Sequence, residues 1–244
     1  MLIDAHQHVG DCRVFDLEVS EQMVLDAIVE HCLDHVLVMP FPGAGDAPAV
    51  HDRIAAMSTA TGGRVRGIVN FNPHQDPALY ASEVERCVSE LGFVAVKLHT
   101  LGHAVEPQSR DGRMVFEQAA RLEVPVIVHT GGAGEPFAHP THALRLAREW
   151  SDLPVVLAHA GMGAASHEAA LVAELCPNVY LETSWCSTLD TAMLARTIGA
   201  HRMMLGSDAT QNLGVEIAKH HAIGLSEAEL DQCLGATAAR VFGL

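Results

Sequence analysis

Eight short apolar runs recur along the chain at intervals of about thirty residues, and they constrain its fold more than any other feature. The runs occupy residues 2–8, 35–40, 65–71, 93–99, 124–130, 154–160, 178–185 and 202–208. They are rich in Val, Ile and Leu, with little alternation of apolar and polar residues. Such runs are typical of parallel strands that are covered by helices on both faces.

Stretches with helical spacing of apolar residues lie between these runs. The first begins at Ser20, which is a capping residue, and extends to Leu33. Asp76 and Pro77 open another, because proline fits the first turn of a helix. Similar stretches occupy residues 114–122, 142–150, 166–175 and 189–198. This alternation predicts an α/β fold, a TIM (β/α)8 barrel that forms one compact domain over residues 1–244.

An open, doubly wound sheet is the alternative arrangement of the same elements. Such a sheet carries a glycine-rich phosphate-binding turn after its first strand, and the segment AHQHVGDCR does not have that pattern. Loops rich in Gly and Pro follow three of the strands, at residues 41–48, 100–112 and 130–140. In a barrel these loops lie on the face where active sites are built. Residues 226–244 predict two short amphipathic helices that close the domain.

Composition excludes several classes of protein. Hydrophobic residues make up 49% of the chain, which excludes a disordered protein. A formal charge of −15 argues against nucleic acid as a partner, because phosphate contacts need clustered cations. The six cysteines form no C-x-x-C pair, and no apolar stretch is long enough to span a membrane. We therefore expect a cytoplasmic protein with reduced thiols, no signal peptide and no membrane partner.

Two histidines at the end of the first strand give the clearest indication of chemistry. His6 and His8 are two residues apart, so on a strand their side chains point the same way, into the barrel mouth. Two imidazoles aimed at one point suit Zn²⁺, Fe²⁺ or Mn²⁺. An H-x-H pair taken alone, however, more often consists of ordinary structural histidines.

Titratable residues at the ends of other strands strengthen the prediction of a metal centre. The fourth strand ends with Lys97 and His99, and the fifth, sixth and eighth end with His129, His159 and Asp208. Such groups are costly inside a buried strand unless they are paired or bound to metal. Their presence at the same end of five strands predicts a metal site there.

Taken in order, these motifs resemble the amidohydrolase superfamily. The motifs are D-x-H-x-H, V-K-L-H, V-H-T-G, A-H-A-G and G-S-D, on the first, fourth, fifth, sixth and eighth strands. The ending G-A-T-A-A-R-V-F-G-L resembles that of the amidohydrolase-related branch, which includes metal-dependent hydrolases and decarboxylases. Other branches carry a small β-sandwich domain, for which this sequence has no flanking segment. The resemblance therefore implies a single barrel without a β-sandwich.

The resemblance also implies roles for the strand-end residues. The metal ligands would be His6, His8, His129 and Asp208. The ion would be a divalent metal, zinc first, with manganese or iron as alternatives. Asp208 would also accept a proton from the metal-bound water, and His159 would polarise the substrate carbonyl or transfer a proton. Asp4 would either support a ligand from behind or serve only as a turn anchor.

Lys97 has three interpretations. In two-metal members of the superfamily, a lysine on the fourth strand forms a bridging carbamate. In one-metal members, a lysine here can bind a substrate carboxylate or contribute to the electrostatics of the site. The third interpretation is an amine that reaches solvent at the strand end. We favour the second, and with it one ion over two.

Other residues are candidates for contact with substrate. His99 shares a side of its strand with Lys97, and Trp185 could stack on a substrate ring. Arg110 and Arg113 could bind a carboxylate. We place His103 and His139 in the mouth loops, where they could contact substrate. We place His220 and His221 on a helix surface.

Three functions follow from this set. The leading hypothesis is a hydrolase in which metal-activated water attacks an amide, lactone or ester carbonyl of a small carboxylated molecule. The alternative is a non-oxidative decarboxylase or a hydratase on the same site. A non-catalytic metal-containing binding protein is less favoured, because both His159 and Asp208 are present. Short loops leave the mouth open, which is compatible with a homo-oligomer in which a partner subunit covers it.

Overall fold

The computed structural model describes residues 1–132 and 136–244. Within these residues, one sheet contains nine strands in the order β2-β1-β3-β4-β5-β6-β7-β8-β9. Eight of them are parallel and match the eight predicted runs: β1 (Ile3–Cys12), β3 (His35–Pro40), β4 (Val65–Val69), β5 (Ala95–Leu98), β6 (Val126–His129), β7 (Val155–Ala158), β8 (Val179–Glu182) and β9 (Met203–Met204). The remaining strand, β2 (Leu17–Val19), is antiparallel to β1.

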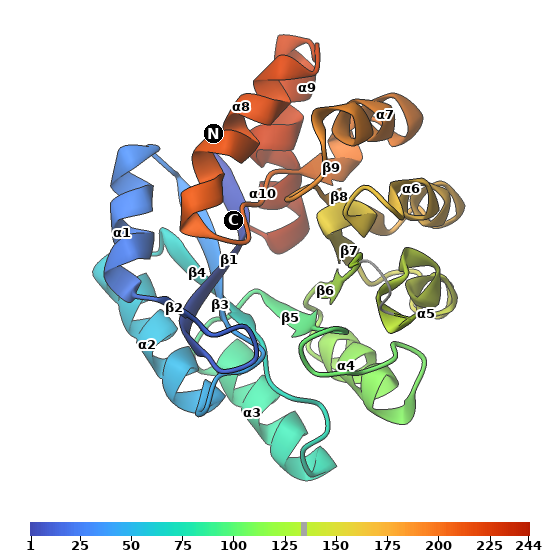
Figure 1. Cartoon of the computed structure of the whole chain (residues 1–244). Helices are drawn as coiled ribbons and strands as arrows, with labels where there is room; N and C mark the ends of the chain where they lie inside the picture. The colour runs from blue at the N-terminus through green and yellow to red at the C-terminus, as the bar shows by residue number, and fades with distance from the viewer. Residues whose placement is uncertain (133–135) are drawn as a thin grey trace.

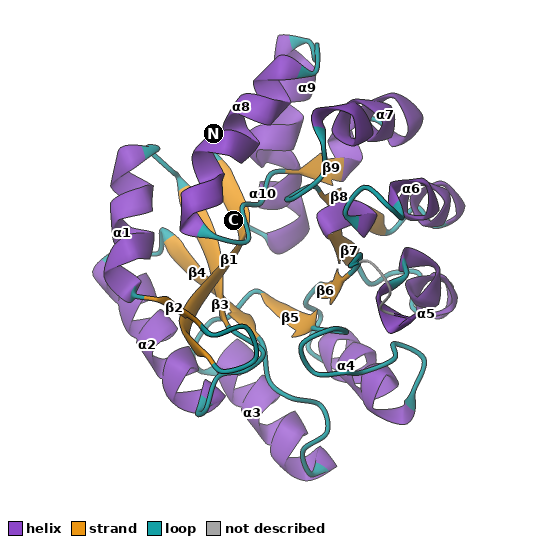
Figure 2. Ribbon diagram, viewed as in Figure 1, coloured by secondary structure: helices purple, strands orange, loops and turns teal. Residues whose placement is uncertain are grey.

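The helices form a ring around the strands (Figures 1 and 2). In chain order they are α1 (Glu21–Glu30), α2 (Ala47–Ala60), α3 (Pro77–Ser89), α4 (Arg110–Arg121), α5 (Leu144–Glu149), α6 (Ser166–Leu175), α7 (Thr188–Ile198), α8 (Leu213–Ala222), α9 (Glu227–Asp231) and α10 (Thr237–Phe242). A π-helical turn at Gln232–Ala236 joins α9 to α10, and together they form the closing helical segment that was predicted.

The sheet closes into a barrel between β1 and the segment after β9. Ala5 N donates to Leu205 O at 3.0 Å, and Asp208 N donates to His6 O at 2.7 Å. These bonds close the sheet. They confirm the predicted TIM (β/α)8 barrel and exclude the alternative, a doubly wound open sheet. Closure also brings His6 and Asp208, which are about 200 residues apart in the chain, to adjacent positions.

Both faces of the strands are buried, which explains why the strands appear in the sequence as continuous apolar runs. One set of side chains fills the barrel interior, including Ile3, Leu37, Ile68, Ile127 and Met204. The alternate set packs against the surrounding helices, including Val36, Val96, Val126, Val155 and Val179. The packed interior leaves only the carboxyl ends of the strands free to build a site.

The sequence prediction did not include α2 or the β1–β2 hairpin, and it gave α8 no bounds, although it placed His220 and His221 on a helix. The first turn of α2 overlaps the loop that was predicted at residues 41–48. The buried face of α8 carries Glu216, Lys219 and His220, which conceal its amphipathic pattern. The hairpin places Phe15 and Leu17 in exposed positions, where apolar periodicity gives no signal.

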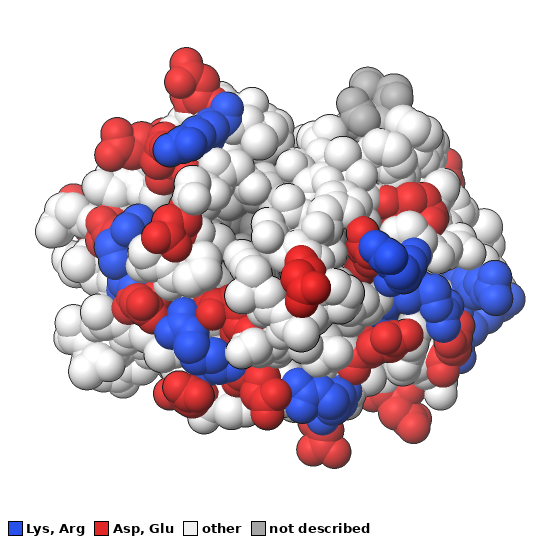
Figure 3. All heavy atoms as spheres, turned by 90° about the horizontal axis from the view of Figure 1, so that it is seen from below, with Lys and Arg blue, Asp and Glu red and all other residues white. Residues whose placement is uncertain are grey.

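The surface agrees with the composition. On the face shown in Figure 3, Asp and Glu side chains are widely spread, and Lys and Arg side chains lie among them, with one group of adjacent blue side chains at the right edge. Among the described helices, none combines the length and the apolar character needed to cross a bilayer.

Candidate metal centre

Three predicted ligands converge where β1 meets the segment after β9. His6 Nε2 lies 3.3 Å from His8 Nε2. Asp208 Oδ1 lies 3.3 Å from His6 Nε2 and 3.4 Å from His8 Nε2. The two imidazoles are buried, whereas the Asp208 side chain keeps 26% of its surface exposed. Two nitrogens and one oxygen therefore face a common point that is open on one side.

The far nitrogen of each imidazole is held by an acceptor. His6 Nδ1 donates to Glu182 Oε2 at 2.8 Å, and His8 Nδ1 donates to the carbonyl oxygen of Pro40 at 3.0 Å. With a proton on each Nδ1, both Nε2 atoms keep their lone pairs directed at Asp208. Metal-binding histidines characteristically use their second nitrogen in this way.

Glu182, at the end of β8, connects several parts of the site. Its carboxylate accepts hydrogen bonds from His6 Nδ1, from the His159 backbone N–H at 3.2 Å and from the Ser184 hydroxyl at 3.0 Å. A Cβ atom at Gly206 would lie 2.6 Å from this carboxylate, so glycine is needed there. The sequence prediction gave Glu182 no role, although a carboxylate in an apolar strand was an available signal.

His129 is the fourth predicted ligand, and it is not a member of the cluster formed by His6, His8 and Asp208. Its ring stacks on His99 with 4.5 Å between the centroids. Both of its ring nitrogens are buried, and neither has a hydrogen-bond partner among the residues that the structure describes. An imidazole in this state is costly unless another group satisfies it. The unpaired nitrogens and the adjacent N,N,O cluster together fit a divalent metal ion.

Lys97 points at the same cluster from β5. Its Nζ lies 3.1 Å from His6 Nε2. Burial lowers the pKa of Lys97 to about 8, although Asp208 and Glu182 oppose the shift. The side chain is only 1% exposed, so its amine does not reach solvent at the strand end. The lysine therefore contributes its charge to the floor of the site.

Asp4 fixes the backbone beneath the ligands. Its carboxylate accepts from the backbone N–H groups of His6 at 3.1 Å and Ser207 at 2.9 Å, and from the Ser207 hydroxyl at 2.6 Å. Burial raises the pKa of Asp4 to about 7, although these hydrogen bonds act in the opposite direction. Asp4 thus links the first strand to the segment that carries Asp208.

His159 and Asp208 have complementary charge states. Burial lowers the pKa of His159 to about 4, so its imidazole is neutral at pH 7. His159 Nδ1 lies 2.8 Å from the Ser184 hydroxyl. Burial tends to raise the pKa of Asp208, but His159 and His6 hold it well below its ordinary value. Asp208 is therefore an ionised carboxylate beside a neutral imidazole.

Three residues of the site have left-handed backbone conformations. His159, Trp185 and Asp208 each have a φ of 64°. For residues other than glycine, such conformations cost about 1–3 kcal/mol each and cluster at functional sites. The strain places their side chains around one opening, where Trp185 Nε1 donates to Asp208 Oδ2 at 2.8 Å.

A cavity of about 450 Å³ lies over these residues. Its polar lining consists of His8, His99, His129, His159, Trp185 and Asp208. Its remaining lining consists of Gly132 and the apolar side chains of Phe15, Leu17, Phe41, Leu101 and Met162. The predicted contact residues His99 and Trp185 thus face the same space as the proton-transfer candidates His159 and Asp208. A cavity of this size is typical of small-molecule sites.

Comparison with known proteins gives the family. A family model described as amidohydrolase matches residues 42–244. The chain belongs to the amidohydrolase family. Its members are enzymes, which favours catalysis over the non-catalytic binding protein considered above.

This amidohydrolase has several known relatives. A 2-keto-4-carboxy-3-hexenedioate hydratase from Sphingobium sp. is 34% identical over 83 residues, which cover 32% of this chain and only 24% of the hydratase. The structure of 5-carboxyvanillate decarboxylase from Novosphingobium aromaticivorans, with manganese bound, is 15% identical, covers 100% of this chain and 96% of its own, and has a TM-score of 0.78. The structure of a probable 2-pyrone-4,6-dicarboxylic acid hydrolase from Acinetobacter baumannii is 15% identical and has a TM-score of 0.70. The match covers 100% of this chain and 99% of the hydrolase. The two solved structures share the barrel fold.

Several candidate residues lie away from the centre of this amidohydrolase. Arg110 pairs with Asp111, and Arg113 pairs with Glu149. Neither arginine lines the cavity over the metal centre. The expectation that either binds a substrate carboxylate there is therefore not supported by the structure.

The remaining candidate histidines differ in their placement. His103 Nε2 donates to the carbonyl oxygen of Pro42 at 3.1 Å, and His139 pairs with Glu168. His220 was expected on a helix surface, and this is wrong: it lies on the buried face of α8 and is fully buried, and its Nδ1 donates to the Glu216 carbonyl oxygen. Part of the predicted loop at residues 130–140 lies outside the described residues.

A buried ion pair on α8 supports the Trp185 segment of the amidohydrolase. Glu216 Oε1 accepts from the Trp185 backbone N–H at 2.9 Å. Lys219 Nζ donates to the carbonyl oxygens of Thr183 at 2.7 Å and Cys186 at 3.1 Å. This pair explains why α8 buries polar side chains toward the barrel.

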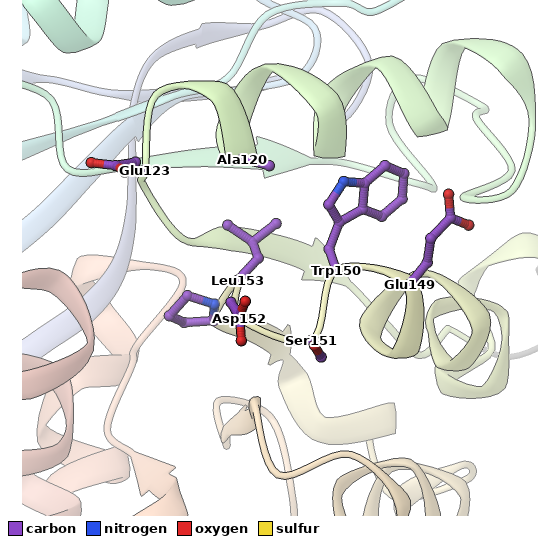
Figure 4. Close-up of a pocket in the computed structure, with 8 residues that line it drawn as sticks. Ala120, Glu123, Glu149, Trp150, Ser151, Asp152 and Leu153 are labelled. Atoms are coloured by element: carbon purple, nitrogen blue, oxygen red, sulfur yellow. The ribbon is translucent and has the colours of Figure 1, made fainter.

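A second pocket, of about 430 Å³, shares no lining residue with the cavity over this centre, and Figure 4 shows the side chains that line it. It is formed by the end of α4 and by the segment 149–154, which leads into β7. Segments that lead into strands lie at the amino-terminal end of a barrel. This end contributes to stability, whereas active sites lie at the opposite end. The pocket is therefore separate from the candidate metal centre.

Proposed function

We propose that the chain is a metal-dependent hydrolase that acts on an amide, lactone or ester carbonyl of a small carboxylated molecule. The observation that carries the proposal is the convergence of His6 Nε2, His8 Nε2 and Asp208 Oδ1 within 3.4 Å of one another. The unpaired nitrogens of His129 beside them support a fourth ligand from β6.

A single ion fits the residues better than two. A second group of candidate ligands, His6, His159 and Glu182, shares His6 with the first. The Glu182 carboxylate already accepts bonds from His6, from the backbone of His159 and from Ser184. We therefore propose one ion, Zn²⁺ first, because two or three imidazoles with one carboxylate suit it. Mn²⁺ is the alternative, since the similar decarboxylase structure contains it.

The residues divide the proton transfer between them. A bound divalent ion would lower the pKa of water to about 7 and polarise a carbonyl oxygen. The ionised Asp208 accepts the proton of the attacking water as the new C–O bond forms. Its Oδ2 is held by Trp185, which leaves Oδ1 beside the histidines. The proton then passes to the leaving nitrogen or oxygen as its bond to the carbonyl carbon breaks.

His159 orients the substrate in this scheme. Its Nδ1 is occupied by the Ser184 hydroxyl, so Nε2 is the nitrogen available to the cavity. Because the Ser184 hydroxyl donates to Glu182, it accepts from His159 Nδ1–H, so the neutral Nε2 is an acceptor that can take a proton from a hydroxyl or water in the cavity and return it to the leaving group. Lys97 supplies positive charge near His6, at the end of the cavity where negative charge develops.

Decarboxylation or hydration on the same site is the second candidate. The similarity to a 5-carboxyvanillate decarboxylase and to a hydratase supports it. In a decarboxylase the proton would go to carbon as a C–C bond breaks. In a hydratase water would add to a double bond without cleavage of the skeleton.

Turnover in H₂¹⁸O separates these reactions. The protein is loaded with one equivalent of Zn²⁺ or Mn²⁺ and is incubated with panels of lactones, esters, amides and aromatic carboxylates. A hydrolase places one ¹⁸O atom in the product carboxylate, a hydratase places it in a hydroxyl group, and a decarboxylase releases CO₂. Asp208→Asn should abolish turnover, whereas Asp152→Asn, in the remote pocket, should not. Release of CO₂ without ¹⁸O incorporation would contradict the hydrolase.

A further inference from the structure

The β1–β2 hairpin adds an apolar wall to the cavity. Phe15 and Leu17 lie on this hairpin and line the cavity, although 40% and 51% of their surfaces are exposed. The Phe15 ring centroid is 6.4 Å from that of His99, whose ring stacks on His129. The hairpin therefore meets the row of imidazoles that leads to the metal centre.

Apolar side chains from other elements complete this part of the lining. Phe41 follows β3 and stacks on the ring of His8 with 4.8 Å between the centroids. Leu101 and Met162 line the same cavity from the segments after β5 and β7. These residues surround the space between the imidazoles and solvent.

In the part of the cavity lining that the structure describes, charge is confined to the metal end. Among the described lining residues, Asp208 is the only acidic side chain, and no arginine or lysine is present. Lys97 Nζ contacts His6 Nε2, but the side chain is buried and is not part of the lining. A second carboxylate on the substrate would be desolvated here without a cation, which is unfavourable. An aromatic or aliphatic group would instead bury its surface against the hairpin.

We propose that this site selects substrates whose reacting carbonyl lies at the metal centre and whose opposite end is an uncharged aromatic or aliphatic group held by Phe15 and Leu17. The proposal rests on the proposed metal-dependent function. It gives the hairpin the role of setting specificity. Any carboxylate of the substrate then belongs at the metal end and not at the outer end.

Three hydroxamates test this selection without turnover. Acetohydroxamate reports on the metal alone, whereas benzohydroxamate and 4-carboxybenzohydroxamate differ only by a charge at the outer end. Their dissociation constants are measured by calorimetry on the Zn²⁺-loaded protein. Benzohydroxamate should bind at least about tenfold more tightly than its 4-carboxy analogue, because the added carboxylate finds no cation. Equal or tighter binding of the 4-carboxy analogue would overturn the proposal.

Variants of the hairpin assign the preference to its residues. Phe15→Ala should weaken benzohydroxamate binding several-fold and leave acetohydroxamate unchanged. Val14→Ala is the matched control, because Val14 is an exposed residue of the same hairpin that does not line the cavity. Leu17→Arg should strengthen binding of the 4-carboxy analogue by about tenfold through a new ion pair.

The outcomes distinguish the two proposals. If acetohydroxamate binds but benzohydroxamate and its 4-carboxy analogue bind equally, the specificity proposal fails and the metal centre stands. If acetohydroxamate does not bind to protein incubated with Zn²⁺, the metal-dependent function fails, and the specificity proposal fails with it.

Discussion

Glu182 Oε2 accepts a hydrogen bond of 2.8 Å from His6 Nδ1, and this contact ties the end of β8 to the end of β1. It orients His6 so that Nε2 faces His8 and Asp208. The contact joins residues that are 176 positions apart, and only the closed barrel brings them together.

Replacing Glu182 should weaken metal binding. Glu182→Gln removes the carboxylate that holds the proton on His6 Nδ1, so Zn²⁺ affinity should fall by about 10–100-fold. The affinity is measured by competition with a chromophoric chelator. Glu106→Gln is the matched control, because Glu106 accepts a bond of 2.9 Å from His142 Nδ1 and belongs to none of the candidate metal groups among the described residues. An equal loss in both variants would show that Glu182 has no specific effect on the ion.

Trp185 should affect the rate and not the metal content. Trp185→Phe keeps an aromatic ring but removes the Nε1–H that donates to Asp208 Oδ2 at 2.8 Å. A hydrogen bond to a charged group contributes about 1.5–3 kcal/mol, so kcat should fall about tenfold or more. Trp150→Phe, at the remote pocket, is the control. A loss of bound metal in Trp185→Phe would contradict the expected separation of roles.

The buried Lys97 should lower the free energy of unfolding of the metal-free protein at neutral pH. Burial lowers the pKa of Lys97 to about 8, whereas the ordinary lysine value is 10.5. Between pH 8 and pH 10.5 the unfolded chain therefore binds more protons than the folded protein. The free energy of unfolding should therefore rise with pH across this window. Lys97→Met should lack the rise and should be more stable at pH 7 by about 1–3 kcal/mol. Denaturant unfolding of both metal-free proteins from pH 7 to pH 10 measures the difference. A less stable Lys97→Met variant would contradict this assignment.

Glu83 provides an acid-sensitive contact between α2 and α3. Burial tends to raise the pKa of Glu83, but hydrogen bonds from His51, Arg86 and Cys87 lower it to about 2. Its stabilising effect is complete above the unfolded value of 4.5 and is lost as pH falls toward 2. Glu83→Gln should thus be less stable than the parent by about 1–3 kcal/mol at pH 7. This difference should shrink below pH 4.5, and a constant difference from pH 7 to pH 2.5 would contradict it.

Much of the barrel could be predicted because its constraints are local. Strands buried on both faces produce apolar runs, and these runs identified all eight parallel strands. The barrel also fixes which strand ends meet, so His6, His8 and Asp208 could be expected together before their contacts were seen. The register of β1 and closure at Ser207 then set the distances.

The remaining features depend on tertiary contacts that leave little periodic signal. Glu216 and Lys219 are buried because they bind the segment around Trp185, and in the sequence they look like surface residues of a helix. Phe15 and Leu17 lie on an exposed hairpin whose apolar side chains face a cavity and not a core. Spacing alone could not show that Glu182 would reach His6.

Metal content per chain is the most direct test of the central claim. The protein is purified without a His-tag or added metal, and its metal content is determined by elemental analysis. We expect about one equivalent of Zn²⁺ or Mn²⁺ per chain, and we expect His6→Ala to lose it. A chain that holds no metal, even after incubation with Zn²⁺ or Mn²⁺, would contradict the assignment of His6, His8 and Asp208 as a metal centre.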